Sequence, residues 1–313
     1  MPLLRINATN NGPRLHGADR PLMPTLAHAA NGDGPVIIMV HGYKFAPGSA
    51  DNCPHDHILS MREDHDCPKA LSWPRALGFG TANADEGLGL AFGWSARGSV
   101  WQAYARAEEA GADLAQVIAA LRRLAPHRPI HALAHSMGAR VVLSALRRLP
   151  GHSVNRVILL AGAEYQTHAN EALNSPAGQS AEVINITSRE NDFYDFLLER
   201  LISPPVRGDL TIGAHLSQRP NALTLQLDDP VTLRALAWHG FRIDPPQRRV
   251  CHWSAYLRPG VFDLYRALLR APQRHPLAQL RPLLPDQPAP RWSRLFAWPA
   301  LPHSLPLTGK APS

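Results

Sequence analysis

Ala134-His135-Ser136-Met137-Gly138 is the most informative segment of the 313-residue chain. It follows a short apolar run, residues 129–133, and precedes residues 139–148, whose apolar positions recur with helical spacing. A serine between small residues at a strand-to-helix junction is typical of a nucleophile elbow, a tight turn that strains the serine backbone and exposes its hydroxyl. We therefore expect Ser136 to be a nucleophile. The alternative is a serine that only caps the following helix.

With 313 residues the chain has room for one large domain or two small ones. Its composition is that of a globular protein, since 45% of the residues are hydrophobic and 18% are charged. No apolar run is long enough for a transmembrane helix, and the first residues lack the pattern of a secretory signal. The three cysteines, Cys53, Cys67 and Cys251, show no repeated spacing. A Cys53–Cys67 bridge stays open as an alternative, but we expect a cytoplasmic protein with reduced thiols.

The net charge of +7 comes from arginines spread through the chain. Because these arginines form no cluster with interleaved aromatic residues, we expect no nucleic-acid partner. A positive charge of this size favours anionic substrates only mildly. The oligomeric state is left undetermined by the sequence.

Strand-like and helix-like segments alternate along the chain. We expect strands at residues 35–40, 88–92, 129–133, 154–160 and 182–186, and helices at residues 99–124, 139–148, 193–202 and 261–269. Such alternation predicts a mostly parallel sheet with helices on both faces.

Two segments do not fit this alternation. Residues 44–83 hold Gly, Pro, Asp and His with little apolar pattern, and a loop of this length is usually functional, for example as a cover over a site. Residues 271–313 are rich in proline, so we expect a folded α/β domain at residues 1–270 followed by an extended tail. The tail segment 291–298 mixes arginine with tryptophan and phenylalanine, which leaves peripheral membrane contact open.

The chain resembles the α/β-hydrolase superfamily over roughly residues 35–270. The resemblance rests on the elbow, in which Ala134 replaces the usual first glycine, and on the segments HGYKFAPGS, CPHDHILS, AHSMGARV and CHWSAYLRPGVFDLYRALL, which are similar to bacterial hydrolases without assigned substrates. It implies an α/β-hydrolase fold. The short connection at residues 160–182 leaves no room there for a large cap domain, so any lid must come from residues 44–83 or 203–220.

The superfamily's order of catalytic residues, Ser, then Asp or Glu, then His, implies a base late in the chain. His252 stands in a polar turn directly before the final helix, which is where the superfamily places its histidine. His239 is the alternative, although its surroundings favour a packed structural histidine.

The same order implies an acid after the strand at residues 182–186. We expect Asp192 to be this acid. Glu190 and Asp195, two and three residues away, are the alternatives within the same segment. Glu164 is the other alternative, because some lipases take their acid from the preceding strand. Asp192 is also a reasonable N-cap for the helix at residues 193–202.

An acyl-transfer intermediate needs two hydrogen-bond donors for its oxyanion. The superfamily implies the backbone N–H groups of Met137, directly after the nucleophile, and of Tyr43, in the turn His41-Gly42-Tyr43 after the first core strand. The Tyr43 side chain could equally line an acyl pocket, and His41 is expected to support the turn.

Residues 53–67 contain five potential metal ligands, which are Cys53, His55, His57, His65 and Cys67. Their spacing matches no common zinc module. We therefore expect no metal and no cofactor, and a hydrogen-bonded loop that borders the substrate cleft.

The sequence thus predicts a serine hydrolase of the esterase or lipase type that cleaves a small-molecule acyl ester through an acyl-enzyme. Two alternatives stay open: an acyltransferase with the same triad, and a non-catalytic binding module on the same fold. The substrate and its acyl chain length are left undetermined.

Overall fold

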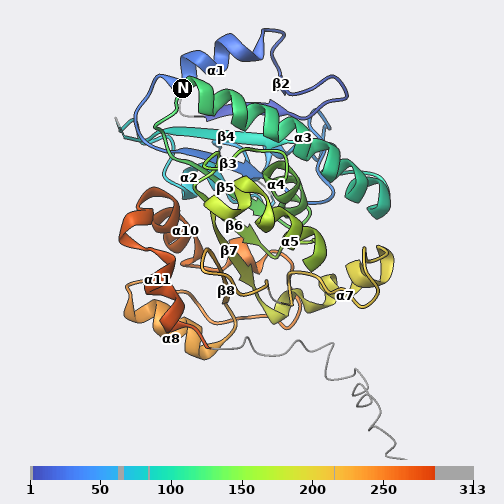
Figure 1. The fold of residues 1–313 in the computed structure, drawn as a ribbon, viewed down its shortest axis with the longest axis vertical. Coiled ribbons are helices and arrows are strands. Elements are labelled where there is room, and N and C mark those ends of the chain that lie inside the picture. The colour runs from blue at the N-terminus through green and yellow to red at the C-terminus, as the bar shows by residue number, and fades with distance from the viewer. Residues whose placement is uncertain (1–2, 63–66, 84, 215, 286–313) are drawn as a thin grey trace, which may run out of the picture.

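The protein is built around one eight-stranded sheet (Figure 1). The computed structural model describes residues 3–285 apart from residues 63–66, 84 and 215. The strand order is β2-β1-β4-β3-β5-β6-β7-β8, and every pair is parallel except β1 with β2. The strands are β1 (Leu3–Asn7), β2 (Arg14–Leu15), β3 (Val36–Val40), β4 (Leu88–Gly93), β5 (Ile130–His135), β6 (Arg156–Leu160), β7 (Glu182–Thr187) and β8 (Ala222–Gln226).

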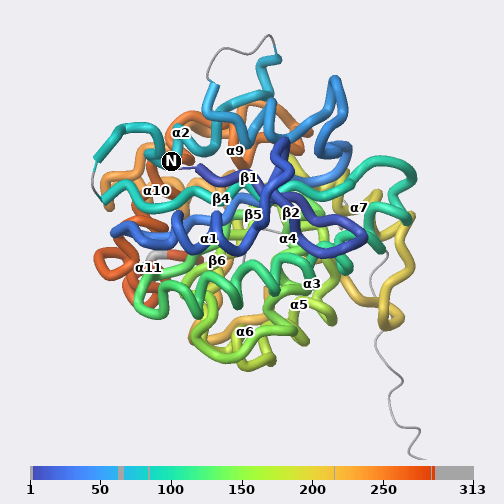
Figure 2. The backbone as a smooth tube through the Cα atoms, turned by 90° about the horizontal axis from the view of Figure 1, so that it is seen from above, coloured from blue at the N-terminus to red at the C-terminus, as the bar shows by residue number. Residues whose placement is uncertain are grey.

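Helices cover both faces of this sheet, as the view along it shows (Figure 2). One face is covered by α1 (Leu22–Ala30), α3 (Val100–Leu124), α4 (Gly138–Leu146), α5 (Gln166–Asn174), α6 (Pro176–Ser180) and part of α7 (Asp192–Leu201). The other is covered by α2 (Trp73–Ala76), α8 (Pro230–Trp238), α9 (Ser254–Leu257), α10 (Val261–Arg270) and α11 (Leu277–Leu280). Short 3₁₀ turns are η1 (Pro54–Asp56), η2 (Arg189–Asn191), η3 (Pro272–Arg274) and η4 (Arg281–Leu283).

The central strands read as continuous apolar runs because both of their faces are buried. In β3, Ile38 packs into the cluster under α3 and α4, whereas Ile37 and Met39 pack into the cluster under α10. Successive side chains of a strand point to opposite faces, so one strand contributes to both cores. The predicted architecture, a mostly parallel sheet between two helical layers, is confirmed.

The long helix α3 packs against α4, the helix that follows Ser136 in the chain. Ser99 and Gln102 form a reciprocal capping box that starts the helix. Gly111 then lets α3 approach α4 closely, because a Cβ there would lie 2.3 Å from the Ser144 Oγ atom. Close contact of these helices holds α4, and with it the turn that precedes α4.

The structure differs from the expected elements at the sheet edges. Strands β1, β2 and β8 were not predicted, since β2 has two residues and β8 mixes polar with apolar positions. Residues 44–83 also form more than a cover, because Leu59, Trp73 and Phe79 are buried in the core.

The predicted tail begins after α10, which ends at Arg270 as expected. Its first part is not extended: α11 buries Leu277 and Leu280 against the core. The aromatic and basic segment 291–298 lies outside the described residues. Within residues 3–285, excluding the gaps, no helix has the length and apolar character needed to cross a membrane.

Candidate active site

Ser136 occupies a strained turn between β5 and α4. Its φ angle is 55°, in the left-handed region that a non-glycine residue enters at a cost of about 1–3 kcal/mol. Neighbouring backbone holds it there: the Ser136 N–H donates to Leu160 O at 2.9 Å, and Ser136 O accepts from the Ala163 N–H at 3.0 Å. The turn therefore has the backbone geometry that the sequence predicted for a nucleophile elbow.

Close packing explains the small residues around this turn. A Cβ on Gly138 would lie 2.6 Å from His41 O, and one on Gly42 would lie 2.7 Å from the Ser136 Cβ atom. Both positions therefore require glycine. Ala134, which replaces the first glycine of the usual motif, is fully buried in β5 and has no such conflict to resolve.

His252 contacts Ser136 directly. The His252 Nε2 atom lies 2.9 Å from the Ser136 Oγ atom, and the His252 Nδ1 atom lies 2.6 Å from the Asn191 Oδ1 atom. The amide oxygen accepts a hydrogen bond, so Nδ1 carries the ring proton. Nε2 is then free to accept the hydroxyl proton of Ser136, which is the protonation state that a general base needs.

The residue on Nδ1 differs from the expected one. The sequence predicted Asp192 in this place, but the hydrogen bond comes from its neighbour Asn191. Asn191 ends the 3₁₀ turn η2, and Asp192 is the buried first residue of α7. The hydrogen-bond partner thus comes from the expected loop, one residue before the expected position, and an amide stands where a carboxylate was expected.

Two of the other candidate acids are occupied elsewhere. Glu190 is buried and forms an ion pair with Arg258 and a hydrogen bond with Ser188. Glu164 is buried, accepts from the Tyr104 hydroxyl and pairs with Arg140 at 2.5 Å. Burial alone raises the pKa of Glu164, but the hydrogen bond from His168 and the charge of Arg140 outweigh it and lower the pKa.

The remaining alternatives do not contact Ser136 by any hydrogen bond between described residues. Asp195 lies one turn further along α7, buried against Gly213. His239 is the exposed C-cap residue of α8. Of the two candidate bases, the structure therefore brings only His252 to the serine.

The surroundings of His252 favour its neutral form. Burial lowers the pKa of His252 well below its ordinary value, and the nearby ring of His135 lowers it further. The His135 Nε2 atom donates to His252 O at 3.0 Å, and the Tyr194 ring stacks on His252 with a centroid separation of 4.6 Å. The imidazole is thus held from three sides and is uncharged at neutral pH.

Two backbone N–H groups are available beside the serine. Within the described residues, neither the Met137 N–H nor the Tyr43 N–H donates to a protein acceptor. His41 fixes the peptide group before Tyr43: its Nε2 atom accepts from the Trp94 N–H at 3.0 Å, so its Nδ1–H donates to Gly42 O at 2.8 Å. In a trans peptide the C=O and N–H point in opposite directions, so the Tyr43 N–H is directed away from His41.

The serine is covered in this conformation. Ser136 is only 4% exposed, and Trp253, next to the base, lies under the Lys69 ammonium at 3.5 Å. Lys69 belongs to the segment 44–83, which therefore borders the site. The Tyr43 hydroxyl donates to Gly98 O at 2.6 Å, which ties this side chain to the loop before α3.

A large cavity of about 870 Å³ lies at the other edge of the sheet. It is lined by Leu3, Asp33, Gly87 and Arg128, which precede or begin strands β1, β3, β4 and β5. Ligands of open parallel sheets bind at the carboxyl ends of the strands. This cavity is therefore not the site around Ser136.

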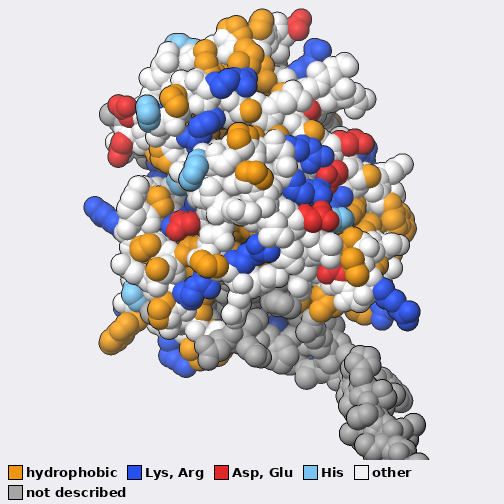
Figure 3. All heavy atoms as spheres, viewed as in Figure 1, with side chains coloured by type: hydrophobic (Ala, Val, Ile, Leu, Met, Phe, Trp, Pro, Cys, Tyr) orange, Lys and Arg blue, Asp and Glu red, His pale blue; other side chains and the backbone are white. Residues whose placement is uncertain are grey.

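The predicted cysteine–histidine loop is only partly described. Cys53 and His55 are buried, Cys67 is exposed, and no disulfide joins the three cysteines. The Cys53–Cys67 bridge is therefore absent. His65 lies outside the described residues. On the face in Figure 3, lysine and arginine side chains are interspersed with acidic and apolar side chains and form no continuous basic stripe.

Residues 25–176 match a family described as alpha/beta hydrolase of unknown function. In three dimensions the chain is similar to an alpha/beta hydrolase fold protein from Nakamurella multipartita, with 12% sequence identity and a TM-score of 0.37, over 77% of this chain and 94% of that one. No curated protein matches the sequence significantly.

Proposed function

We propose that this chain is a serine hydrolase of the α/β-hydrolase superfamily that cleaves an ester or related acyl bond through an acyl-enzyme. One observation carries the proposal: the Ser136 hydroxyl, on a strained turn, lies 2.9 Å from the His252 Nε2 atom. A serine hydroxyl is a weak nucleophile until a base takes its proton, and this contact supplies the base.

The proposed reaction begins when the Ser136 Oγ atom attacks the substrate carbonyl carbon and its proton moves to His252 Nε2. The N–H groups of Met137 and Tyr43 stabilise the negative oxygen of the tetrahedral intermediate. The carbon–leaving-group bond then breaks and His252 returns the proton to the leaving group. Water attacks the acyl-enzyme by the same steps and releases the carboxylic acid.

With Asn191 as its third residue, the proposed triad differs in charge from a Ser-His-Asp triad. Its amide oxygen holds the Nδ1–H tautomer of His252, as the third residue of a serine triad must do. It brings no negative charge to stabilise the imidazolium that forms during the reaction. A Cys-His-Asn arrangement serves other acyl-transfer enzymes. We therefore expect the enzyme to prefer substrates whose leaving groups need little protonation, such as activated esters.

A series of p-nitrophenyl esters of increasing acyl chain length tests this function. The wild type should hydrolyse at least one member of the series and should react with a fluorophosphonate probe. Ser136→Ala should lose both activities, whereas Ser95→Ala, at an exposed serine, should retain both. A wild type that neither hydrolyses nor labels would favour a non-catalytic binding module, and a Ser136→Ala variant that keeps its rate would refute the mechanism.

Acyl transfer to an alcohol is a second candidate function. It is favoured by the 4% exposure of Ser136 and by the Tyr194 ring over His252, since a covered site limits the access of water. Partition of the acyl group between water and an added alcohol distinguishes the two functions. If the chain is an esterase, the acyl group should pass to water rather than to the added alcohol.

We also propose that the protein acts in the cytoplasm on a small acyl ester without a cofactor. The three unpaired cysteines support a reducing compartment. Cell fractionation of the untagged protein tests the location, and recovery in a secreted or membrane fraction would contradict it.

A further inference from the structure

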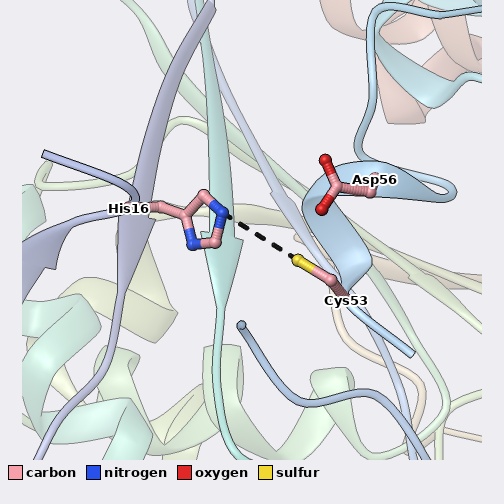
Figure 4. Close-up of side chains that lie close together, drawn as sticks. All are labelled: His16, Cys53 and Asp56. Carbon is pink, nitrogen blue, oxygen red and sulfur yellow. Dashed lines mark hydrogen bonds between the residues drawn. The ribbon is translucent and has the colours of Figure 1, made fainter. Parts of the chain in front are cut away.

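We propose that His16, Cys53 and Asp56 bind a zinc ion at a site separate from Ser136. The three side chains come from two distant parts of the chain. His16 directly follows β2, Cys53 precedes the 3₁₀ turn η1, and Asp56 ends that turn (Figure 4). This arrangement makes the site depend on the fold.

The separations of the ligand atoms suit a tetrahedral ion. The His16 Nε2 atom lies 3.9 Å from the Cys53 Sγ atom, and one oxygen of Asp56 completes a set in which all atoms lie within 4.8 Å of one another. Zinc bonds of about 2.3 Å to sulfur and 2.0 Å to nitrogen place two ligands roughly 3.5 Å apart. The histidine and the cysteine are therefore close to bonding positions. The Asp56 side chain is 67% exposed and can rotate to close the remaining gap.

The chemistry of the three ligands selects the class of metal. A thiolate, an imidazole and a carboxylate suit zinc, whereas Mg²⁺ and Ca²⁺ prefer oxygen ligands alone. On binding, the Cys53 thiol releases its proton to solvent, and water fills the fourth position. Asp56 gives up its ion pair with Arg5, a 4.0 Å contact between exposed groups that is worth little.

Asn7 supplies the support that metal-bound histidines usually have. The Asn7 Nδ2 atom lies 3.1 Å from His16 Nδ1, and its Oδ1 atom lies 2.7 Å from His55 Nε2. A metal on His16 Nε2 requires the ring proton on Nδ1, so the Asn7 amide turns over and accepts it. The same rotation moves the His55 proton to Nδ1, a buried atom without a partner among the described residues.

The position of the site indicates what the metal does. Asn7 ends β1, and Gly93 ends the neighbouring β4. A Cβ on Gly93 would lie 2.7 Å from His55 Nε2 and 2.9 Å from Asn7 Oδ1. The zinc site therefore fastens the segment 44–83 to the carboxyl edge of the sheet, the edge that also carries Ser136. The spacing of residues 53–67 could not predict this, because His16 lies 37 residues before Cys53.

The test is metal titration of the full chain after removal of bound metal with a chelator. We expect one Zn²⁺ per chain by calorimetry, and one Co²⁺ with the near-ultraviolet charge-transfer absorption of a cobalt–thiolate bond. Cys53→Ser and His16→Gln should each weaken binding at least about 100-fold, and Asn7→Ala about 10- to 100-fold. Cys67→Ser and His28→Gln, at exposed residues, should bind as the wild type does.

Circular dichroism of each variant separates loss of the site from loss of the fold. His16 is only partly buried, so His16→Gln should keep the wild-type spectrum even if Cys53→Ser does not. Failure of the wild type to bind zinc stoichiometrically would overturn the proposal, as would a folded His16→Gln variant with unchanged affinity or a cobalt–thiolate absorption that depends on Cys67. Ester hydrolysis is not the readout, so the zinc site and the proposed function fail or stand separately.

Discussion

The His252 Nδ1 atom lies 2.6 Å from the Asn191 Oδ1 atom, so the group that orients the proposed catalytic imidazole is an uncharged amide. The neighbouring carboxylate of Asp192 starts α7 instead. An amide can select the ring tautomer as well as a carboxylate can, but it offers no charge to the imidazolium. This difference separates two contributions that a Ser-His-Asp triad combines, and it can be measured.

Substitution of Asn191 should affect turnover more than substitution of Asp192. Asn191→Ala removes the hydrogen bond that fixes the tautomer, and we expect kcat to fall by roughly 100-fold. Asp192→Asn keeps the residue shape at the start of α7 and should change kcat less than about fivefold, with a stability loss of about 1 kcal/mol from the first helical turn. Steady-state kinetics on p-nitrophenyl esters and thermal melts provide the comparison. A larger fall in kcat for Asp192→Asn would assign the triad acid to Asp192.

The pH dependence of turnover should reflect the buried, uncharged base. Because burial and His135 lower the pKa of His252 well below 6.5, the base stays unprotonated in mildly acidic solution. We expect kcat/KM to hold at pH values below 6.5 and to fall only at more acidic pH. Asn191→Asp adds a negative charge beside the ring, so it should raise the pKa of His252 and move the acidic limb to higher pH. An acidic limb at or above pH 6.5 in the wild type would contradict this account.

The elbow could be predicted from sequence because it is local. Strand β5, the two residues Ser136 and Met137, and helix α4 follow one another without a gap, so the turn is visible in the local sequence. His252 could be predicted through the order of the superfamily's residues. The central strands could be predicted because both of their faces are buried, which makes each strand a continuous apolar run in the sequence.

Other features depend on register or on distant contacts. The 3₁₀ turn η2 decides whether residue 191 or 192 faces the imidazole, and no spacing rule predicts such a turn. A search of the sequence for a triad carboxylate also leaves out asparagine, because its side chain is an amide. Strand β1, next to one sheet edge, and strand β8, at the other, gain their pairing from β4 and β7 rather than from their own pattern. The contact of His16 with Cys53 likewise requires the folded sheet edge.

Acid should destabilise the fold through its buried histidines. Burial is the main reason that the pKa is lowered from 6.5 to about 4 in His41, about 3 in His131 and about 4 in His135. Between these values and 6.5 the unfolded chain binds more protons than the folded chain. The free energy of unfolding therefore falls as the pH drops through this window, by up to about 1.4 kcal/mol per pH unit for each histidine.

His131 offers a specific test of this acid sensitivity. It is fully buried, and neither ring nitrogen has a hydrogen-bond partner within the described residues. Between pH 6.5 and 4, His131→Leu should reduce the slope of the unfolding free energy against pH by up to about 1.4 kcal/mol per pH unit, which corresponds to one proton. The variant should also be more stable than the wild type at low pH. The control is His127→Leu, at an exposed residue four positions earlier. Urea unfolding at several pH values gives both slopes, and equal slopes for wild type and His131→Leu would show that His131 does not contribute.

Gly42→Ala should impair turnover by moving the oxyanion donor. The added Cβ would lie 2.7 Å from the Ser136 Cβ atom and 3.0 Å from His135 O, so the backbone around Tyr43 must shift. Loss of one oxyanion donor costs roughly 10²- to 10³-fold in kcat, and we expect a fall in that range with KM nearly unchanged. Gly151→Ala is the matched control, because its Cβ would meet nothing closer than 3.5 Å. Wild-type kcat in a folded Gly42→Ala variant would exclude the Tyr43 N–H as a donor, whereas a change in KM alone would place this turn in substrate binding.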